Sequence, residues 1–273
     1  MNKAGWVRIG IQKTNGGSTV FHSPSVPFEE RRKINMKKHL PYDLSPEELT
    51  MYTSSWTGER DMYGRPYVAD HILDAIEKYV SIPCAWEALN HQGYVHQTIT
   101  GYDSTLPDQA MVGRALTAVY LPLRPDMRKQ LMTEGHHCGE NGDMVSWPIE
   151  RLQKRDVYVA DVFGKHEFGP IIGERLASAI YNRSGNGAVH YASVRDIDGI
   201  RGIRGFNAFY KGVHPSHGSP TTINLMGINC PIRMERVCVM PGDVVLAKED
   251  TVLFIPPQFA EKIAMRGTVV HFM

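Results

Sequence analysis

The sequence predicts an α/β protein, in which short strands alternate with helices along one chain. Runs rich in valine and isoleucine are followed by stretches with apolar residues three and four apart, and Pro241-Gly-Asp243 gives a turn between two such runs. Hydrophobic residues make up 42% of the 273, enough to fill a large core without disulfides. We expect one large layered domain with an added segment.

The first 79 residues are predicted to be an N-terminal extension. A polar arm covers residues 1 to about 40. A short helix begins after it, because Ser45 is a good cap and Pro46 suits the first helical position. A loop with Arg60 and Arg65 follows, and these side chains could reach a neighbouring subunit's pocket and meet an anionic substrate. The amphipathic helix Ala69 to Val80 leads into the main domain, residues 80–273.

The main domain is predicted from its periodicity, element by element. The expected strands are Val112 to Leu121, Val157 to Val162, Ala188 to Ser193, Phe206 to Tyr210, Val237 to Met240, Val244 to Leu246 and Val252 to Ile255. The expected helices are Cys84 to His91, Asp126 to Glu134, Ile171 to Arg183, Asp196 to Ile203 and Pro257 to Met265.

The charge balance excludes some partners. With 30 basic and 29 acidic residues the net charge is +1, so we expect no nucleic acid and no anionic membrane surface as a partner. No apolar run approaches the roughly 20 residues that span a bilayer, and residues 1–8 lack a signal peptide's apolar segment. We therefore expect a cytoplasmic protein.

The pair Arg195-Asp196 is the strongest candidate for chemistry. It stands where an expected strand gives way to a helix, and Glu174 stands at the start of the preceding helix. A guanidinium beside a carboxylate can hold an anionic substrate with one group and a divalent metal with the other. The alternative is an acid favoured by the helix dipole beside a surface arginine.

Several motifs in this region resemble the RraA-like family. They are Asp161-Val-Phe-Gly164, Gly173-Glu-Arg-Leu-Ala177, Ser193-Val-Arg-Asp-Ile-Asp198 and Gly205-Phe-Asn-Ala-Phe209, within a resemblance that covers roughly Val80 to Ile263. The family includes metal-dependent 4-hydroxy-4-methyl-2-oxoglutarate aldolases and regulators of ribonuclease E. The resemblance implies the swivelling β/β/α fold and a homotrimer or a hexamer of paired trimers.

The resemblance also implies roles for the candidate residues. Asp196 would bind Mg²⁺ or Mn²⁺, and Arg195 would stabilise the enolate formed on cleavage. Glu174, where the family commonly has aspartate, would act through water in a proton relay. The main chain of Gly173, Arg175 and Leu176 would bind a substrate carboxylate. Because the metal ion would act as the Lewis acid, cleavage would need no Schiff-base lysine.

Besides Glu174, a second position departs from the aldolases. Gly199 stands where the family has an acidic residue, three positions after the metal-binding aspartate. The proton relay is therefore the part of the site that the resemblance leaves open.

Other polar residues have two interpretations each. Asp161 would face the site or cap a turn, and Lys165 with His166 would bind a second substrate carboxylate. His214 and His217 would bind a metal or merely form a turn around Pro215. The run His136-His-Cys138 has soft-metal ligands, but it more closely resembles a solvent loop.

We thus expect a Mg²⁺- or Mn²⁺-dependent lyase that cleaves a 4-hydroxy-2-oxo di- or tricarboxylic acid through a pyruvate-type enolate, with oxaloacetate decarboxylation as a side activity. One alternative is another enolate-type reaction on a hydroxy or sugar acid. The other is a non-catalytic protein that binds a ribonuclease.

Overall fold

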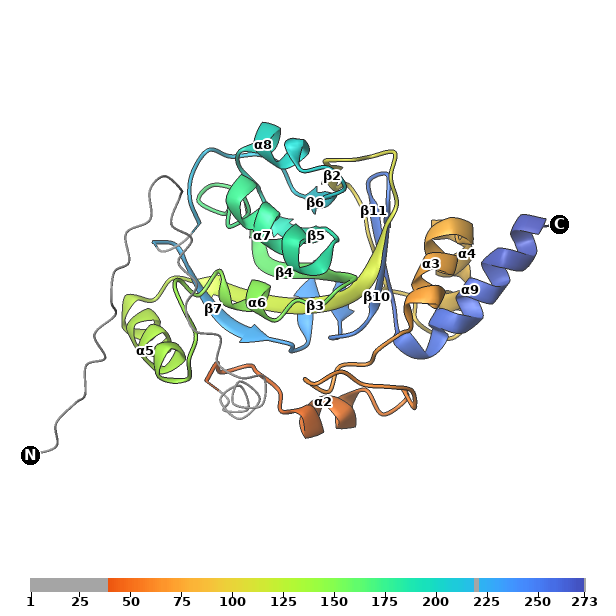
Figure 1. Ribbon diagram of the computed structural model, residues 1–273, viewed down its shortest axis with the longest axis horizontal. Helices are drawn as coiled ribbons and strands as arrows, with labels where there is room; N and C mark the ends of the chain where they lie inside the picture. Colours follow the sequence, from red (N-terminus) through yellow and green to blue (C-terminus); the bar gives the residue numbers. More distant parts are fainter. Residues whose placement is uncertain (1–38, 219–220, 273) are drawn as a thin grey trace, which may run out of the picture.

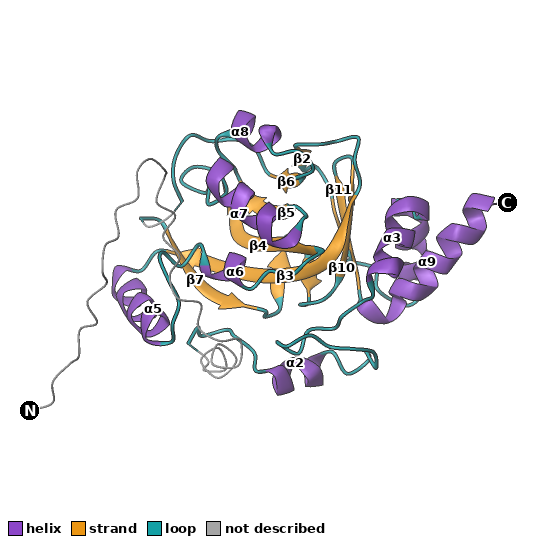
Figure 2. Cartoon of the chain, in the orientation of Figure 1, coloured by secondary structure: helices purple, strands orange, loops and turns teal. Residues whose placement is uncertain are grey.

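A computed structural model describes residues 39–218 and 221–272 of the chain, with a large mixed sheet at its centre (Figures 1 and 2). The expected α/β class is confirmed. The expected polar arm lies almost wholly outside the described residues. The helices are α2 (Pro46–Tyr52), α3 (Asp70–Tyr79), α4 (Ile82–Asn90), α5 (Pro125–His137), α6 (Trp147–Glu150), α7 (Glu174–Ser184), α8 (Ile197–Gly202) and α9 (Pro257–Phe272).

The strands are β1 (Thr98–Ile99), β2 (Asp103–Ser104), β3 (Met111–Pro122), β4 (Asp156–Lys165), β5 (Ala188–Ala192), β6 (Ala208–Tyr210), β7 (Ile223–Ile228), β8 (Ile232–Met234), β9 (Val237–Val239), β10 (Val244–Lys248) and β11 (Thr251–Ile255). Nine of them form one sheet in the order β1-β11-β10-β3-β4-β5-β6-β2, and β7 also pairs with β3. The strands β3, β4, β5 and β6 are parallel.

The parallel strands follow from their connections. Helix α7 joins β4 to β5 and α8 joins β5 to β6, so each crossover returns the chain to the same edge of the sheet. Both helices therefore lie on one face, as Figure 1 shows. The carboxyl ends of these strands meet at one edge, where open α/β sheets commonly bind ligands.

Two apolar cores separate three layers. Trp147, Ile180 and Phe206 belong to a core between the sheet and α6, α7 and α8. Ile232, Val237 and other residues of the β8–β9 hairpin close a second core on the opposite face of the sheet. Helices, main sheet and hairpin thus form the expected β/β/α arrangement.

The N-terminal segment is built into this domain. Ser45 caps α2 in a capping box: its hydroxyl accepts from the Glu48 N–H, and Glu48 accepts from the Ser45 N–H at 2.7 Å. Helix α3 packs with α4 and α9 around Leu73, Ile76 and Ile263 in a third core. The predicted helices at both places are confirmed.

Arg65 corrects one expectation. Its guanidinium is buried, with Nε 2.7 Å from Asp61 Oδ2 and Nη2 2.8 Å from Asp156 Oδ2. Burial alone would lower the pKa of Arg65, but the two carboxylates raise it above its ordinary value. Arg60 donates to the carbonyl oxygens of Trp56 and Gly64. The expectation that Arg65 could reach a neighbour's pocket is wrong, because its side chain is buried within its own chain, and the same expectation for the half-buried Arg60 stays a prediction.

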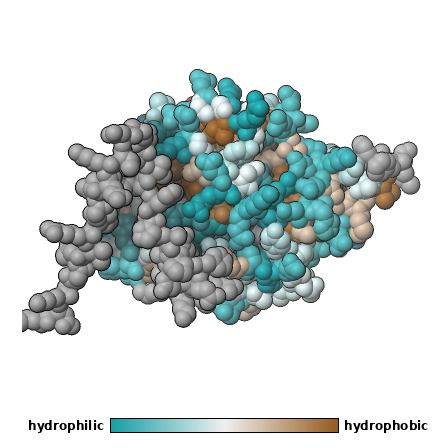
Figure 3. Space-filling model, in the orientation of Figure 1, coloured by the Kyte–Doolittle hydropathy of each residue, from teal (hydrophilic) through white to brown (hydrophobic). Residues whose placement is uncertain are grey.

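The described surface visible in Figure 3 is mainly hydrophilic. None of the described helices is long and apolar enough to cross a membrane.

Candidate active site at the carboxyl edge of the sheet

Three loops meet where the parallel strands end. The first links β4 to α7, the second links β5 to α8, and the third follows β6. The Arg195 N–H in the second loop donates to Ile172 O in the first at 3.1 Å. The Gly218 N–H in the third donates to Pro170 O in the first at 2.7 Å. These hydrogen bonds hold candidate residues from separate parts of the sequence together in one wall of the site.

Asp196 does not act as an ordinary helix cap. It precedes α8 with a left-handed backbone, φ 54°, which costs a non-glycine residue energy and is common at functional sites. Its carboxylate makes no capping hydrogen bond with α8 and is 53% exposed. Oδ2 lies 3.7 Å from Arg195 Nε. The structure thus disfavours the dipole-cap interpretation and leaves this carboxylate accessible to a ligand.

Gly173 gives the pair its space. A Cβ on residue 173 would lie 2.8 Å from Asp196 Oδ2, closer than real Cβ contacts, and 3.2 Å from Arg195 Nε, tighter than most of them, so the side chains of Asp196 and Arg195 would have to shift. The backbone of Gly173 is extended, with φ −133°, so glycine is needed here for the close approach and not for its torsion angles. The structure therefore brings Gly173, Arg195 and Asp196 together.

Glu174 lies against Gly199. A Cβ on residue 199 would meet Glu174 Oε2 at 2.6 Å and Glu174 Cβ at 2.8 Å. The Glu174 side chain thus occupies the space that a longer residue at 199 would need. The two positions at which the chain departs from the aldolase pattern, Glu174 and Gly199, are therefore in contact, which the sequence did not indicate.

Arg175 and Leu176 follow in the first turn of α7. No side chain caps this helix at Gly173. The Arg175 side chain is exposed, whereas Leu176 packs against the helix-side core. Because the first N–H groups of a helix have no partner within it, the main chain here suits an anionic group. Substrate binding by these amides stays a prediction.

His217 joins the site from the third loop. Its Nε2 lies 3.1 Å from Arg195 Nη1, at the other end of the guanidinium from Asp196. The sequence offered His214 and His217 only as metal ligands or turn residues, and it gave no signal of this contact. The described residues contain no group of three or more histidines, cysteines and acids that could hold an ion.

That donor set suits one kind of metal. Zinc sites use three or four protein ligands, which the described residues do not bring together. Mg²⁺ and Mn²⁺ accept one or two carboxylates and fill their remaining positions with water or substrate oxygens. The exposed, uncapped carboxylate of Asp196 fits such an ion, with Glu174 close by on α7.

The remaining candidates have structural roles. Asp161 Oδ1 accepts from the Phe163 N–H at 2.8 Å, which confirms the turn-cap interpretation. Burial raises the pKa of Asp161, while the Phe163 bond opposes that rise. Cys138 is buried at the end of α5 beside Glu134, so the soft-metal interpretation of its run is wrong within the described residues.

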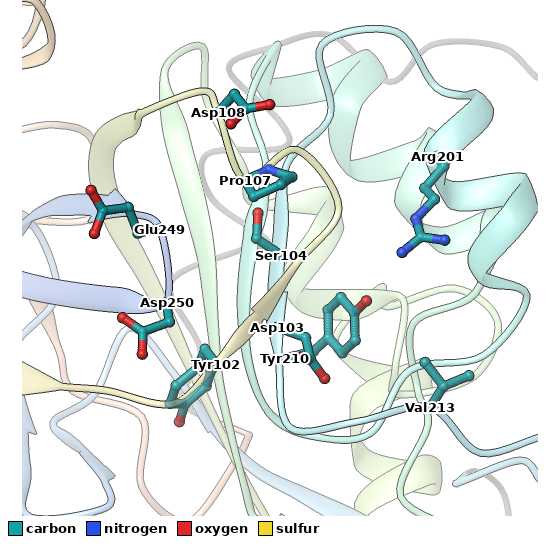
Figure 4. Close-up of a pocket in the computed structure, with 10 residues that line it drawn as sticks. All are labelled: Tyr102, Asp103, Ser104, Pro107, Asp108, Arg201, Tyr210, Val213, Glu249 and Asp250. Carbon is teal, nitrogen blue, oxygen red and sulfur yellow. The ribbon is translucent and has the colours of Figure 1, made fainter.

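A separate pocket of about 650 Å³ lies beyond α8 (Figure 4). Four carboxylates line it, with Arg201 and Tyr210 on one side (Figure 4). These acids are Asp103, Asp108, Glu249 and Asp250. Their excess of negative charge disfavours an anionic substrate. Arg201 lies in the last turn of α8 and Asp196 precedes the helix, while Val213, which pairs with Val194 beside Arg195, also lines the pocket, so the pocket borders the loops of the candidate site.

Comparisons with known proteins agree with the fold and the motifs. A family model described as RraA-like, aldolase/RraA, matches residues 70–254. Protein DlpA of Legionella pneumophila is 26% identical over 161 residues, which cover 59% of this chain and 24% of that protein. The chain thus spans about a quarter of the length of this curated relative.

Two solved structures show the same fold. One is Streptomyces coelicolor RraAS2, described as an unusual member of the RNase ES inhibitor RraA family, with 20% identity, 79% of this chain and 96% of that chain covered, and a TM-score of 0.62. The other is an uncharacterized protein from Pseudomonas syringae pv. tomato, with 20% identity, 75% and 88% covered, and a TM-score of 0.60.

Proposed function

Because this chain belongs to the RraA-like family, we propose that it is a divalent-metal-dependent lyase that cleaves a 4-hydroxy-2-oxo di- or tricarboxylic acid. The observation that carries the proposal is the accessible, uncapped carboxylate of Asp196 beside the guanidinium of Arg195. A surface ion pair at a helix start would need neither the left-handed backbone of Asp196 nor the glycine that makes room for it.

Arg195 is suited to the charge that develops in this reaction. Breaking the C3–C4 bond turns the C4 hydroxyl into a carbonyl and leaves the electron pair on C3, from which it spreads to the 2-oxo oxygen. A bound Mg²⁺ or Mn²⁺ would supply Lewis-acid stabilisation of that oxygen, with Asp196 as its protein ligand. The fixed positive charge of Arg195, 28% exposed, stabilises the same negative charge and helps to orient the substrate.

Glu174 is the candidate for proton transfer. The C4 hydroxyl must lose a proton, and C3 must gain one to give the pyruvate-type product. The Glu174 carboxylate stands at the start of α7, over Gly199, and is the acid that shares this wall with Asp196. The amides of Gly173, Arg175 and Leu176 would hold the carboxylate next to the 2-oxo group.

The proposal also includes an oligomeric state and a side activity. We propose a homotrimer, or a hexamer of two trimers, and oxaloacetate decarboxylation through the same enolate. The aldolase-type substrate of choice is 4-hydroxy-4-methyl-2-oxoglutarate.

Pyruvate release from purified protein tests the proposal. After chelation, we expect release from 4-hydroxy-4-methyl-2-oxoglutarate or oxaloacetate only when Mg²⁺ or Mn²⁺ is restored. Arg195→Ala should lower kcat/KM by about a hundredfold or more, because it removes a charge aimed at the transition state. Arg124→Ala, at a surface ion pair 68% exposed, is the matched control and should change little. Arg195→Ala activity within about threefold of wild type would rule out this role.

Two other functions have specific support. RraAS2 is described as a member of the RNase ES inhibitor family, which favours a non-catalytic ribonuclease-binding role as the second candidate. The Glu174–Gly199 packing favours a third, an enolate-type reaction on another hydroxy or sugar acid. Metal binding without pyruvate release would favour the third; ribonuclease inhibition without metal binding would favour the second.

A further inference from the structure

The loop after β6 carries two imidazoles. That of His217 lies beside Arg195, and that of His214 lies in the turn that precedes it. His217 Nε2 is 3.1 Å from Arg195 Nη1. A guanidinium has only donors, so this hydrogen bond makes Nε2 the acceptor. In the neutral imidazole the proton is therefore on Nδ1. His217 thus presents one N–H group that its contact with Arg195 does not use.

A chain of hydrogen bonds sets the tautomer of His214. The Phe168 N–H donates to Ser216 Oγ at 2.8 Å, and Ser216 Oγ lies 2.7 Å from His214 Nδ1. The Ser216 N–H also donates to Nδ1, at 3.3 Å. Nδ1 of His214 is therefore an acceptor, and Nε2 carries the proton. Both histidines present an N–H group.

The surrounding contacts hold this loop in place. The ring of His166 packs edge-on against His214, with centroids 5.4 Å apart. The Gly218 N–H donates to Pro170 O at 2.7 Å. The two loops that carry the imidazoles and Phe168 are thus linked through backbone and side chains, so binding a ligand there would require little ordering.

The orientation of the Arg195 side chain shows how these N–H donors lie relative to the reacting end of the substrate. Its Nε faces Asp196 at 3.7 Å, and its Nη1 faces His217. A substrate whose 2-oxo group lies near Asp196 would extend along the guanidinium toward the imidazole of His217. One cation and neighbouring N–H donors suit a carboxylate, because hydrogen bonds to a charged acceptor are the strong ones.

We propose that His217, supported by His214, binds the substrate carboxylate farthest from the 2-oxo group and makes the site selective for dicarboxylic acids. This assignment rests on the proposed function for the identity of the substrate. It moves the distal carboxylate from Lys165 and His166, which the sequence offered as candidates, to the loop that contacts Arg195.

Paired substrates test the selectivity. 4-Hydroxy-4-methyl-2-oxoglutarate is compared with 4-hydroxy-4-methyl-2-oxopentanoate, in which a methyl group replaces the distal carboxylate and the reacting atoms are unchanged. His217→Ala should lower kcat/KM for the dicarboxylic acid roughly tenfold or more and change the monocarboxylic acid little. A similar loss for both substrates, or for neither, would overturn the proposal.

Two further variants distinguish a loss of carboxylate binding from a general loss of structure or activity. His217→Gln keeps an acceptor for Arg195 and an N–H donor, so it should retain most of the selectivity. His91→Ala removes a histidine just after α4 that is 70% exposed, and should match wild type. If His217→Ala does not fold, His217→Leu takes its place. Loss of selectivity in His217→Leu would support the proposal, and retained selectivity would overturn it.

Binding without turnover distinguishes this inference from the proposed function. If wild type cleaves neither substrate, the lyase proposal fails, and calorimetry then compares 2-oxoglutarate with 2-oxopentanoate in the presence of Mg²⁺. Tighter binding of 2-oxoglutarate that His217→Ala abolishes would still support the subsite. Equal binding of both acids by wild type would refute it.

Discussion

At the scale of single residues, two glycines define the dimensions of the candidate site. Gly173 allows Asp196 and Arg195 to approach the start of α7, and Gly199 receives the side chain of Glu174. The acidic and basic residues were predicted from their motif, since neighbours in sequence stay close in space. The glycine contacts were not, because they join residues of different loops.

Gly173→Ala should separate activity from stability. The added Cβ would displace Asp196 and Arg195, and a misplacement of this size should lower kcat/KM roughly tenfold to a hundredfold. The extended backbone accepts alanine, so the loss of unfolding free energy should be about 1 kcal/mol. Steady-state kinetics and urea unfolding measure the two quantities.

Gly185→Ala is the matched control at the other end of α7. Its φ of 63° disfavours alanine by about 1 kcal/mol, but no atom lies within 4 Å of the new Cβ. This variant should lose similar stability and keep its activity. Equal activity of the two variants would contradict the crowding argument at Gly173.

The contact between His217 and Arg195 shows what a single sequence leaves out. The two residues are 22 positions apart, and they meet because β5 and β6 are parallel neighbours whose carboxyl ends share an edge. Periodicity predicted the strands but not this adjacency. The histidine was therefore recognised as polar and weighed only as a metal ligand or a turn residue.

At the scale of elements, one link between the N-terminal segment and the sheet is ionic. Arg65 places its guanidinium between Asp61 and Asp156, and Asp156 begins β4. Burial is the main cause that raises the pKa of Asp156, and Arg65 opposes that rise. The arginine therefore stabilises the charged form of this buried carboxylate at the base of the sheet.

Arg65→Met should destabilise the protein by about 3–5 kcal/mol, because it removes the cation that pairs with Asp61 and Asp156 and leaves Asp156 only the longer contact to Arg114 Nε, at 3.7 Å. Arg124→Met breaks an ion pair whose partners are 68% and 69% exposed, and it should cost less than about 1 kcal/mol. Denaturant midpoints of both variants give the comparison. A loss below about 1 kcal/mol in Arg65→Met would show that the link is dispensable.

Elements with a clear period were predicted, and those without one were missed. Strand β4 was expected at Val157 to Val162 and is found at Asp156–Lys165. Strand β7 was missed: all six residues are buried, so no alternation of polar and apolar residues marks it. Helix α6 has four residues, too few to show a helical period.

At the scale of the whole molecule, the layers were predicted through the family resemblance, but the order of strands was not visible in the sequence. Nothing in the pattern of β10 indicates that it pairs with β3 and not with β9, which precedes it. Such pairing depends on which faces must be covered, and only the complete set of elements determines that.

The stability of the whole fold should depend on His190. This side chain is fully buried in β5, and burial lowers its pKa to about 3. Between that value and the ordinary pKa of about 6.5, only the unfolded chain binds the proton, so stability falls as pH falls below 6.5. His190→Leu should remove this slope, about 1 kcal/mol per pH unit.

Urea unfolding of wild type and His190→Leu at pH 5 and pH 7 measures the difference. Other buried groups titrate as well, so the two proteins are compared at each pH. Burial raises the pKa of Asp243 to about 7, and this carboxyl acts with the opposite sign, lowering stability as pH rises toward 7. A variant whose slope equals that of wild type would contradict the assignment to His190.

The pairing of β3 has a consequence for how the protein is made. This central strand is bordered on one edge by β4 and on the other by β7 and β10, and β10 is synthesised last of the three. During translation the part of this second edge at Met111 to Arg114 therefore stays without its partner until the β10–β11 hairpin emerges from the ribosome. An unpaired, apolar strand edge invites association with other chains. The nascent protein is thus most in need of a chaperone in the interval before that hairpin appears.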